Sequence, residues 1–589
     1  MNAELKPSIF LSVILIVALG FAAYGNSLDG AFLWDDIGLV KNNAFIKSWS
    51  HLPAVFKGKM AFEGRNGWNF YRPLQMVTYT IDYSIWNLKV KGYHLTNILL
   101  HISAALGIYW LIRTLFKDNL LSLLTAAFFV VHPVHSEAVA YISGRADPLA
   151  FVFMLLCLLL YINSPPSKGI ATLVLMLASY AAALLSKESS LVLPVLILLY
   201  HYTFKTAVKV KEFLPLAGLA FFYIGMRLVL LKVPPVVVSH STTLVERAPG
   251  FFAAATQYIR LLFFPLDLHM AYGGKMFTFG DPKAILGVMI LFAALFYAFR
   301  KRESGRLVSF SILWFFLTLL PVSNLYPINA YMAEHWLYLP SVGFFLMAAK
   351  AISLLCRMKC LRIFSVFLIS GLLGFYAFLT NRQNLCWREP INFYERNLRY
   401  APDSPELYNN LGNAYQAGGR YEDAIAAYEK AAAIKPDYAR AYYNLGNAYK
   451  TIDRNKEAIV SYKKAVEIRA DYAEAYYNLG VSYKAVDRIA EAMNAYENAI
   501  RIKSDYAEAH NNLGSVYLAF NRTEEAIQSY ETAIHIRPDY AMARGNLALV
   551  YVHLKQYPLA IECYDKAKAL GYANPELAEL LEPYRREEK

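Results

Sequence analysis

The sequence predicts an all-α protein in which a polytopic helical membrane domain precedes an α-solenoid of short helical repeats. Hydrophobic residues make up 57% of the 589 residues and charged residues only 17%, whereas soluble proteins carry about a quarter charged residues. Long apolar stretches recur in the first two thirds of the chain, and a sequence repeat of constant length fills the last third. These observations exclude a disordered chain, a collagen-like chain and an ordinary cytosolic enzyme.

Eleven apolar stretches approach the length that crosses a bilayer as a helix, which is about 17–25 residues. They lie near 8–24, 93–116, 120–134, 147–163, 169–185, 189–204, 213–231, 283–299, 307–323, 337–355 and 361–380. A shorter and more broken run near 251–265 is expected to form a re-entrant or interfacial helix.

The basic residues predict how these stretches are oriented. Residues 1–400 contain 35 Lys and Arg against 18 Asp and Glu, whereas residues 401–589 contain 23 against 27. Basic residues in short loops mark the cytoplasmic side, and here they follow every second apolar stretch. The N-terminus is then cytoplasmic and eleven crossings place the repeats outside the cytoplasm. A first stretch that is a cleavable signal peptide would leave the other ten oriented in the same way.

This orientation places 14 of the 18 acidic residues of 1–400 on the outer face or at outer helix ends. Acidic groups near a membrane are costly and tend to be functional, so we expect any chemistry on the outer face. The five cysteines are scattered and are assigned no chemistry. Basic loops also explain the net charge of +13 better than a nucleic-acid partner does.

A second pattern is the triplet Asn-Leu-Gly, which recurs every 34 residues from Asn410, Asn444, Asn478 and Asn512, with Ala replacing Gly in the copy at Asn546. Alanines and tyrosines repeat in phase with it. The pattern resembles the tetratricopeptide repeat, a helix–turn–helix unit of that length. The predicted domains are a membrane domain in 1–383, a linker with a degenerate half-repeat in 384–404, five repeats in 405–574 and a capping helix in 575–589.

The asparagine ladder has two interpretations. The asparagines are either repeat consensus, satisfied locally at helix ends, or they line the concave face and hydrogen-bond the backbone of an extended peptide. Arrays of such repeats generally present extended binding surfaces, and the Asn-Leu-Gly repeats resemble those of O-GlcNAc transferase. The second interpretation makes five asparagines acceptor-binding residues: Asn410, Asn444, Asn478, Asn512 and Asn546.

Two adjacent carboxylates, Asp35 and Asp36, follow the first apolar stretch on the predicted outer side. Such a pair can position a metal ion or accept a proton, although surface turns also contain Asp-Asp. Arg72 and His94 lie on the same predicted face. The first outer loop therefore combines carboxylates with a cation and an imidazole.

The second outer loop contains His132, His135 and Glu137, followed by Arg145 and Asp147. The first three could ligate a metal, but their spacing does not match a His-Glu-x-x-His helix, and loop histidines more often cap helices or orient their neighbours. Arg145 could pair with Asp147, or it could hold a diphosphate or phosphate ester, which suits a guanidinium.

Two more outer segments carry charge. Lys187 and Glu188 lie between two apolar stretches, where they could simply extend toward the interface. Glu334 begins a polar segment before another stretch. Arg227 lies inside an apolar run, where a charge usually marks a site.

Several segments in a fixed order give a resemblance to a known family. They are Tyr71-Arg72-Pro73-Leu74, His132-Pro133-Val134-His135-Ser136-Glu137-Ala138-Val139, Gly144-Arg145-Ala146-Asp147, Lys187-Glu188 and Leu337-Tyr338-Leu339-Pro340-Ser341. With the five repeats they resemble the transmembrane and tetratricopeptide repeat-containing (TMTC) family, O-mannosyltransferases of the GT-C superfold. The resemblance covers nearly the whole chain except 232–282. The repeats are fewer than in long animal members, which indicates a bacterial or archaeal relative in the plasma membrane.

The resemblance implies a glycosyltransferase that moves mannose or another hexose from a polyprenyl-phosphate donor to Ser or Thr of proteins outside the cytoplasm. It implies that Asp35 or Asp36 either acts as the base or binds a metal ion. A divalent ion is therefore a candidate cofactor. No Gly-x-Gly-x-x-Gly opens a predicted helix, which disfavours a nucleotide-sugar donor.

The chemistry of this reaction selects further residues. A phosphate leaving group is best stabilised by Arg or Lys, which makes Arg72, Arg145 and Lys187 candidates for the donor phosphate. The expected supporting residues are His94, His132, His135, Glu137, Asp147, Glu188 and Glu334.

Two other functions compete with this one. A non-catalytic membrane scaffold would use the repeats for protein assembly and would not depend on Asp35 or Asp36. A transporter would favour charges at mid-bilayer and broken helices, whereas the acidic residues here gather on one face.

Overall fold

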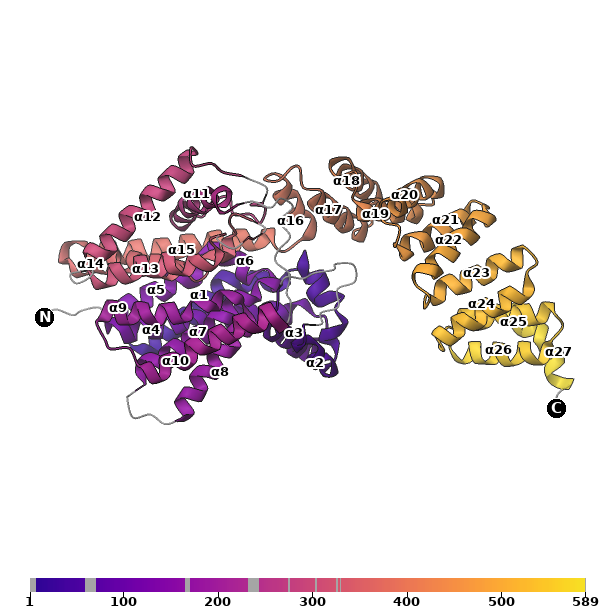
Figure 1. The fold of residues 1–589 in the computed structure, drawn as a ribbon, viewed down its shortest axis with the longest axis horizontal. Helices are drawn as coiled ribbons and strands as arrows, with labels where there is room; N and C mark the ends of the chain where they lie inside the picture. Colours follow the sequence, from indigo (N-terminus) through magenta and orange to yellow (C-terminus); the bar gives the residue numbers. More distant parts are fainter. Residues whose placement is uncertain are drawn as a thin grey trace. The chain divides into compact units, whose positions relative to one another are not determined.

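The computed structural model describes residues 7–58, 70–164, 170–230, 243–273, 276–301, 305–324, 327–328 and 330–587. Within these ranges the chain is helical, with no β-strand, which confirms the all-α prediction (Figure 1). The chain forms two compact units, Met1–Ala401 and Pro402–Lys589.

The first unit is a packed assembly of helices. Their bounds are α1 (Ile9–Tyr24), α2 (Leu52–Phe56), α3 (Pro73–Trp86), α4 (Val90–Phe116), α5 (Asn119–Val131), α6 (Ser136–Val139), α7 (Ala146–Asn163), α8 (Ile170–Ser186), α9 (Leu193–Phe204), α10 (Val210–Gly225), α11 (Leu244–Phe263), α12 (Pro282–Arg300), α13 (Arg306–Leu319), α14 (Ser341–Arg357), α15 (Arg362–Cys386) and α16 (Pro390–Leu398). Helix α5 packs against α1, α4 and α14, and α7 packs against α4 and α8.

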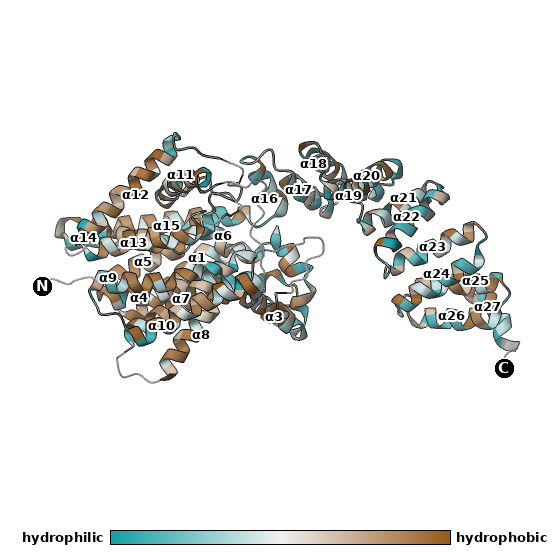
Figure 2. Cartoon of the chain, viewed as in Figure 1, coloured by the Kyte–Doolittle hydropathy of each residue, from teal (hydrophilic) through white to brown (hydrophobic). Residues whose placement is uncertain are grey.

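Apolar surface on the outside of this unit indicates contact with lipid. Large side chains such as Phe221, Phe292, Phe296 and Phe367 are exposed on α10, α12 and α15. Figure 2 shows that hydrophobic residues predominate along the helices of the first unit, whereas hydrophilic residues are frequent on the repeat helices. Soluble proteins rarely expose so many apolar side chains. A bilayer would cover them.

The described residues contain six helical segments long and apolar enough to span a membrane: Ile9–Asp29, Val90–Phe116, Ile142–Asn163, Val210–Val229, Pro282–Arg300 and Arg362–Cys386. A seventh is a pair, Asn119–Val131 and Pro133–Val139, bent by 54°. Shorter apolar helices are Ile170–Ser186, Glu188–Phe204 and Arg306–Val322.

Ten of the eleven predicted stretches thus coincide with apolar helices, but three of these helices belong to the shorter group of 10–17 residues. The eleventh, near 337–355, is α14, whose buried face packs on α5 and α13. Residues 169 and 231, at the ends of two predicted stretches, lie outside the described residues, as do residues 232–242 and 274–275 of the unmatched region 232–282.

The second unit is built from five helix pairs and a terminal helix. The pairs are α17 (Pro405–Ala417) and α18 (Tyr421–Ile434), α19 (Ala439–Thr451) and α20 (Asn455–Ile468), α21 (Ala473–Ala485) and α22 (Ile489–Ile502), α23 (Ala507–Ala519) and α24 (Thr523–Ile536), and α25 (Ala541–His553) and α26 (Tyr557–Ala569), followed by α27 (Pro575–Glu587). Each pair packs on the next, and α27 packs on α26.

The glycine of the Asn-Leu-Gly triplet has a packing reason. A Cβ placed on Gly480 would lie 2.6 Å from a ring carbon of Tyr496, and one on Gly446 would lie 2.6 Å from Tyr462. Each tyrosine comes from the second helix of the same repeat and is almost fully buried. A side chain at the glycine would therefore push the two helices of the repeat apart.

The segment between the predicted domains lies within the first unit. Trp387 stacks on Tyr141 with ring centroids 5.4 Å apart. On α16, the Tyr394 hydroxyl accepts a hydrogen bond from the Trp34 N–H at 3.2 Å, and the Asn397 side-chain oxygen accepts one from the Met270 N–H at 2.9 Å. Most of the region 384–404, which the sequence analysis assigns to a linker, is therefore held in place by specific contacts.

Candidate active site

Asp36 joins the loop after α1, which the sequence predicts to be the first outer loop, to the segment before α7. Its side chain is 1% exposed. One carboxylate oxygen accepts hydrogen bonds from the Ser143 N–H at 2.8 Å and the Ser143 hydroxyl at 2.5 Å, and the other accepts one from the Leu33 N–H at 3.1 Å. Burial raises the pKa of Asp36 to about 7, against the opposing effect of these bonds. Asp36 therefore fixes the position of the loop.

Asp35 lies on the same loop but differs from Asp36 in burial and hydrogen bonding. Its side chain is half-buried, and its N–H donates to the Tyr141 hydroxyl at 3.1 Å. The preceding residue, Trp34, has a φ of 46°, in the left-handed region that bulky side chains rarely adopt. Backbone strain of this kind clusters at functional sites. The two adjacent carboxylates thus have separate environments, one enclosed and one accessible.

Arg145 is completely enclosed. Its side chain is 0% exposed, and one terminal nitrogen lies 2.6 Å from an Asp82 carboxylate oxygen. The Arg145 guanidinium also donates to the Asn97 side-chain oxygen at 2.7 Å, the Tyr93 carbonyl at 2.9 Å and the Thr78 hydroxyl at 3.3 Å. The partner of Arg145 is therefore Asp82 and not Asp147, which corrects the pairing considered from the sequence.

Lys187 forms a second buried ion pair. Its ammonium nitrogen lies 2.6 Å from both carboxylate oxygens of Asp147, and the two side chains are 6% and 5% exposed. The pair joins the start of α7 to the turn between α8 and the short helix η7 (Glu188–Val192).

Arg72, Glu188 and Arg227 form a third, more accessible group. Arg72 makes a two-point contact with Glu188, with nitrogen–oxygen distances of 2.7 and 3.2 Å, and an Arg227 nitrogen lies 3.9 Å from the same carboxylate. All three side chains are between 19% and 29% exposed. Arg227 belongs to a π-helical turn, Met226–Leu230, a geometry that frequently marks functional sites. Two guanidinium groups share one carboxylate, which leaves one net positive charge.

His132 and His135 belong to a buried aromatic cluster. The His135 ring packs against Phe129 and Tyr338, with centroids 4.3 and 5.0 Å apart, and His132 contacts Tyr376 at 4.7 Å. These contacts stabilise the core beneath the site.

Neither ring nitrogen of His94, which is 1% exposed, has a hydrogen-bond partner in the described part of the chain. Among the described residues, no group of three or more His, Cys, Asp or Glu side chains could hold a metal ion.

Glu137 and Glu334 converge from two segments. Glu137 contacts His335, whose ring nitrogen Nδ1 lies 2.8 Å away. One oxygen of Glu334 accepts hydrogen bonds from the His269 N–H at 2.5 Å and the Tyr272 hydroxyl at 2.7 Å. Burial, together with the negative charge of Glu137, raises the pKa of Glu334 well above its usual range. His335 is the residue that the sequence analysis missed, because only the fold brings it beside Glu137.

The ladder asparagines connect successive repeats. The Asn444 amide donates to the Asn409 side-chain oxygen at 2.9 Å. The Asn478 amide donates to the Asn447 side-chain oxygen and to the Tyr443 hydroxyl, both at 3.2 Å. The Asn512 and Asn546 amides also donate to side chains of the preceding repeat. Four of the five amide groups are thus used inside the solenoid. The side-chain oxygens of Asn410, Asn478 and Asn512 also accept hydrogen bonds, from Asn409, Lys450 and Asn511. Every ladder side chain therefore bonds within the solenoid, which supports a structural contribution.

We expect Asn478→Ala to destabilise the repeats. The substitution removes three hydrogen bonds to the preceding repeat, with Tyr443, Asn447 and Lys450. Each is worth about 1 kcal/mol, so the unfolding midpoint of the repeat transition should fall. Thermal unfolding followed by circular dichroism measures it. Asn498→Ala is the matched control, because Asn498 is half-buried and its side-chain hydrogen bonds stay within its own helix. Equal midpoints for both variants would contradict the structural contribution.

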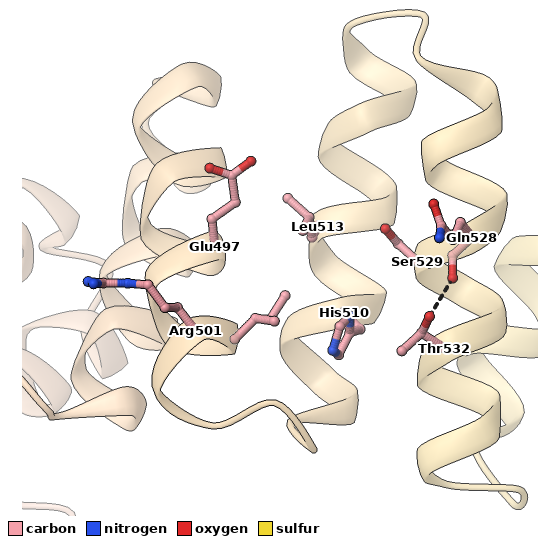
Figure 3. A pocket seen from close by; sticks show the side chains of 8 residues that line it. Glu497, Arg501, His510, Leu513, Gln528, Ser529 and Thr532 are labelled. Carbon is pink, nitrogen blue, oxygen red and sulfur yellow. Dashed lines mark hydrogen bonds between the residues drawn. The ribbon is translucent and has the colours of Figure 1, made fainter.

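Two cavities of about 330 Å³ lie in equivalent places of adjacent repeats. In the one drawn in Figure 3, Glu497 and Arg501 of α22 face Gln528, Ser529 and Thr532 of α24, and α23 lies between them. Within the described repeats, none of the five ladder asparagines lines either cavity. The cavities are therefore separate from the asparagine ladder.

Comparison with known proteins defines the class of this one. Residues 412–453, 452–487 and 485–520 match the TPR repeat family, and residues 507–540 and 525–575 match further tetratricopeptide repeat families. The chain is thus a helical protein with apolar helices suited to a membrane, followed by a tetratricopeptide-repeat solenoid.

About 70% of the chain is also similar to named enzymes. It is 27% identical to protein O-mannosyl-transferase TMTC3 of Mus musculus, over 71% of this chain and 50% of that protein. It is 27% identical to protein O-mannosyl-transferase F38B6.6 of Caenorhabditis elegans, over 70% of this chain and 61% of that protein. A solved structure of MamA is 31% identical over 27% of this chain and 94% of its own, with a TM-score of 0.27. The resemblance to the TMTC proteins is confirmed, and the chain spans about half to three fifths of the length of these relatives.

Proposed function

We propose that this protein is a membrane glycosyltransferase that moves mannose or another hexose from a polyprenyl-phosphate donor to Ser or Thr of proteins outside the cytoplasm. Its similarity to proteins named protein O-mannosyl-transferase supports the reaction class. The observation that carries the proposal is the first outer loop, in which the enclosed Asp36 fixes the backbone and the half-buried Asp35 is presented beside it.

Asp35 is the general base in this proposal. The acceptor hydroxyl oxygen forms a bond to C1 of the sugar, its proton passes to the Asp35 carboxylate, and the C1–O bond to the phosphate breaks with its electron pair remaining on the phosphate oxygen. Such proton transfer contributes about 100-fold or more to the rate. Asp36 is a positioning residue, because its oxygens already accept three hydrogen bonds.

The donor phosphate is assigned to Arg72, with Arg227 beside it. These guanidinium groups are partly exposed and carry one net positive charge after pairing with Glu188, which suits a phosphate leaving group. Arg145 and Lys187 were candidates for the same contact, but each is enclosed with a carboxylate partner. We assign both to the scaffold that holds the outer loops together.

Two oxygen ligands from the half-buried Asp35 carboxylate would not make a closed site for a divalent ion, which usually takes six or more oxygen ligands. Asp36 is not assigned to such a site, because its oxygens accept three hydrogen bonds. The proposed reaction uses no metal step.

The proposed location is the plasma membrane of a bacterium or archaeon, with a cytoplasmic N-terminus and the repeats outside. The basic loops support this orientation. The repeats would then bind the acceptor protein on the same side of the membrane as the proposed reaction. A peptide on the ladder would compete with the hydrogen bonds that the five asparagine side chains already make within the solenoid.

Mass spectrometry of cells that lack the gene tests the function. Proteins outside the cytoplasm should lose a hexose from defined Ser or Thr residues, and the wild-type gene should restore it whereas the Asp35→Asn gene should not. A hexose pattern that does not change on deletion would contradict the transferase and favour the membrane scaffold.

A further inference from the structure

Two tyrosine hydroxyls hold the loop that carries Asp35. The Trp34 N–H donates to the Tyr394 hydroxyl at 3.2 Å, and the Asp35 N–H donates to the Tyr141 hydroxyl at 3.1 Å. Tyr394 belongs to α16, whereas Tyr141 lies between α6 and α7. Both tyrosines are buried. Segments that are far apart in the chain therefore fix two consecutive backbone groups of the loop.

Aromatic rings join these two tyrosines to each other. Tyr141 stacks on Trp387 with ring centroids 5.4 Å apart. The Phe393 ring lies 4.9 Å from Trp387 and 5.1 Å from Tyr394. All four side chains are buried, and aromatic pairs of this kind add about 0.5–1.5 kcal/mol beyond the burial of their area. The two hydroxyls are therefore held at a fixed separation by the rings behind them.

The backbone of Trp34 needs such support. Its φ of 46° lies in the left-handed region, which bulky residues rarely adopt. Holding a residue there costs about 1–3 kcal/mol, and the conformation persists only where the surroundings impose it. The hydrogen bond to Tyr394 and the contact between the two rings, with centroids 6.1 Å apart, impose it here. Relaxation of Trp34 to an ordinary φ would redirect the chain that follows and move the Asp35 carboxylate.

Helix α16 is also fixed independently of this loop. The Met270 N–H donates to the Asn397 side-chain oxygen at 2.9 Å, and the Arg396 guanidinium donates to the Leu268 carbonyl at 3.1 Å. These contacts attach the helix to the segment after α11. The helix is therefore a firm support, which does not follow the loop if the loop relaxes.

We propose that Tyr394 is a positioning residue for the reaction, which acts through the backbone of Trp34 to hold the Asp35 carboxylate where it accepts the proton of the acceptor hydroxyl. This inference rests on the proposed function. Tyr394 contributes to the rate by fixing the base, since a misplacement of about 1 Å at a reacting group can cost about 100-fold. Residues 387–394, which the sequence analysis assigns to a linker, thereby belong to the catalytic unit.

Tyr394→Phe tests the inference, because it keeps the ring and removes only the hydroxyl. With a lipid-linked donor and a Ser/Thr peptide, kcat should fall by about 10- to 100-fold, whereas the KM values for both substrates should not change. Tyr258→Phe is the matched control, since it removes a buried hydroxyl that bonds the Ala333 backbone in the same unit. Both variants should lose similar amounts of thermal stability, and the control should keep the wild-type kcat.

Trp34→Asn distinguishes positioning from a general effect on folding. Asparagine adopts the left-handed conformation more readily than tryptophan does, so the loop should depend less on the Tyr394 hydroxyl. Tyr394→Phe should therefore reduce kcat by a smaller factor in the Trp34→Asn protein than in the wild type. Both proteins in that comparison lack the indole ring, so its loss cancels.

Amide hydrogen exchange reports on the loop without requiring transfer. In the purified full-length protein, Tyr394→Phe should speed exchange in the peptide that contains Trp34 and Asp35, because the Trp34 N–H loses its acceptor. Tyr258→Phe should leave exchange in that peptide unchanged.

Unchanged exchange in the Tyr394→Phe protein would overturn the inference, as would a wild-type kcat. An equal loss of kcat in the wild-type and Trp34→Asn backgrounds would also overturn it. A wild-type protein that shows the expected exchange but transfers no hexose would overturn the proposed function and leave the support of the loop by Tyr394 established. The two failures are therefore separable.

Discussion

Replacing Asp35 with asparagine should reduce hexose transfer by about 100-fold or more, because the variant lacks the carboxylate that accepts the acceptor proton. The side chain is half-buried and the loop is held by Asp36, so the variant should fold normally. Initial rates of transfer to a Ser/Thr peptide, measured with equal amounts of folded protein, give the result.

Asp36→Asn is the matched variant. Its new amide would place a donor against the Leu33 N–H or the Ser143 donors, which should lower stability by about 1–3 kcal/mol. The Asp36 variant should therefore show a lower unfolding midpoint, and the Asp35 variant an unchanged one. Near-normal transfer by the Asp35→Asn protein would show that Asp35 is not the general base.

Arg145→Gln should strongly destabilise the first unit. The substitution leaves Asp82 buried without its cationic partner, and breaking a buried pair in this way costs about 3–5 kcal/mol. It also removes the guanidinium that joins α3, α4 and the start of α7. The unfolding midpoint in detergent, followed by tryptophan fluorescence, should fall by many degrees.

Arg357→Gln provides the comparison. Arg357 pairs with Asp118 at 3.2 Å, but its side chain is 63% exposed, and exposed pairs contribute about 0–1 kcal/mol. Its midpoint should stay close to that of the wild type. An Arg145→Gln protein that keeps the wild-type midpoint and loses only donor binding would contradict the structural assignment. Arg145 would then be assigned to the donor phosphate.

The repeat solenoid could be predicted well from the sequence because its interactions are local and periodic. The spacing of Asn478, Gly480 and Tyr496 recurs in neighbouring repeats, and the structure explains it through packing of the tyrosine ring against the glycine. The membrane region could be predicted as a set of apolar helices. The lengths of individual helices could not, since polar turns such as Ser186-Lys187 end a helix inside a hydrophobic stretch.

The site was predictable in its residue types but not in its pairings. Arg145 and Asp147 are close in sequence, yet their partners are Asp82 and Lys187. Burial decides between an enclosed ion pair and a ligand contact, and burial depends on helices that are distant in sequence. The position of His335 beside Glu137 depends on the same long-range packing.

Transfer by the purified protein from a lipid-linked donor tests the central claim most directly. The protein in nanodiscs would be given either mannosyl-phosphoryl-polyprenol or GDP-mannose, together with Ser/Thr peptides, and the peptides would be examined by mass spectrometry. We expect one hexose on Ser or Thr with the lipid-linked donor, and none with the Asp35→Asn protein. Absence of transfer from the lipid-linked donor, or equal transfer from GDP-mannose, would contradict the account.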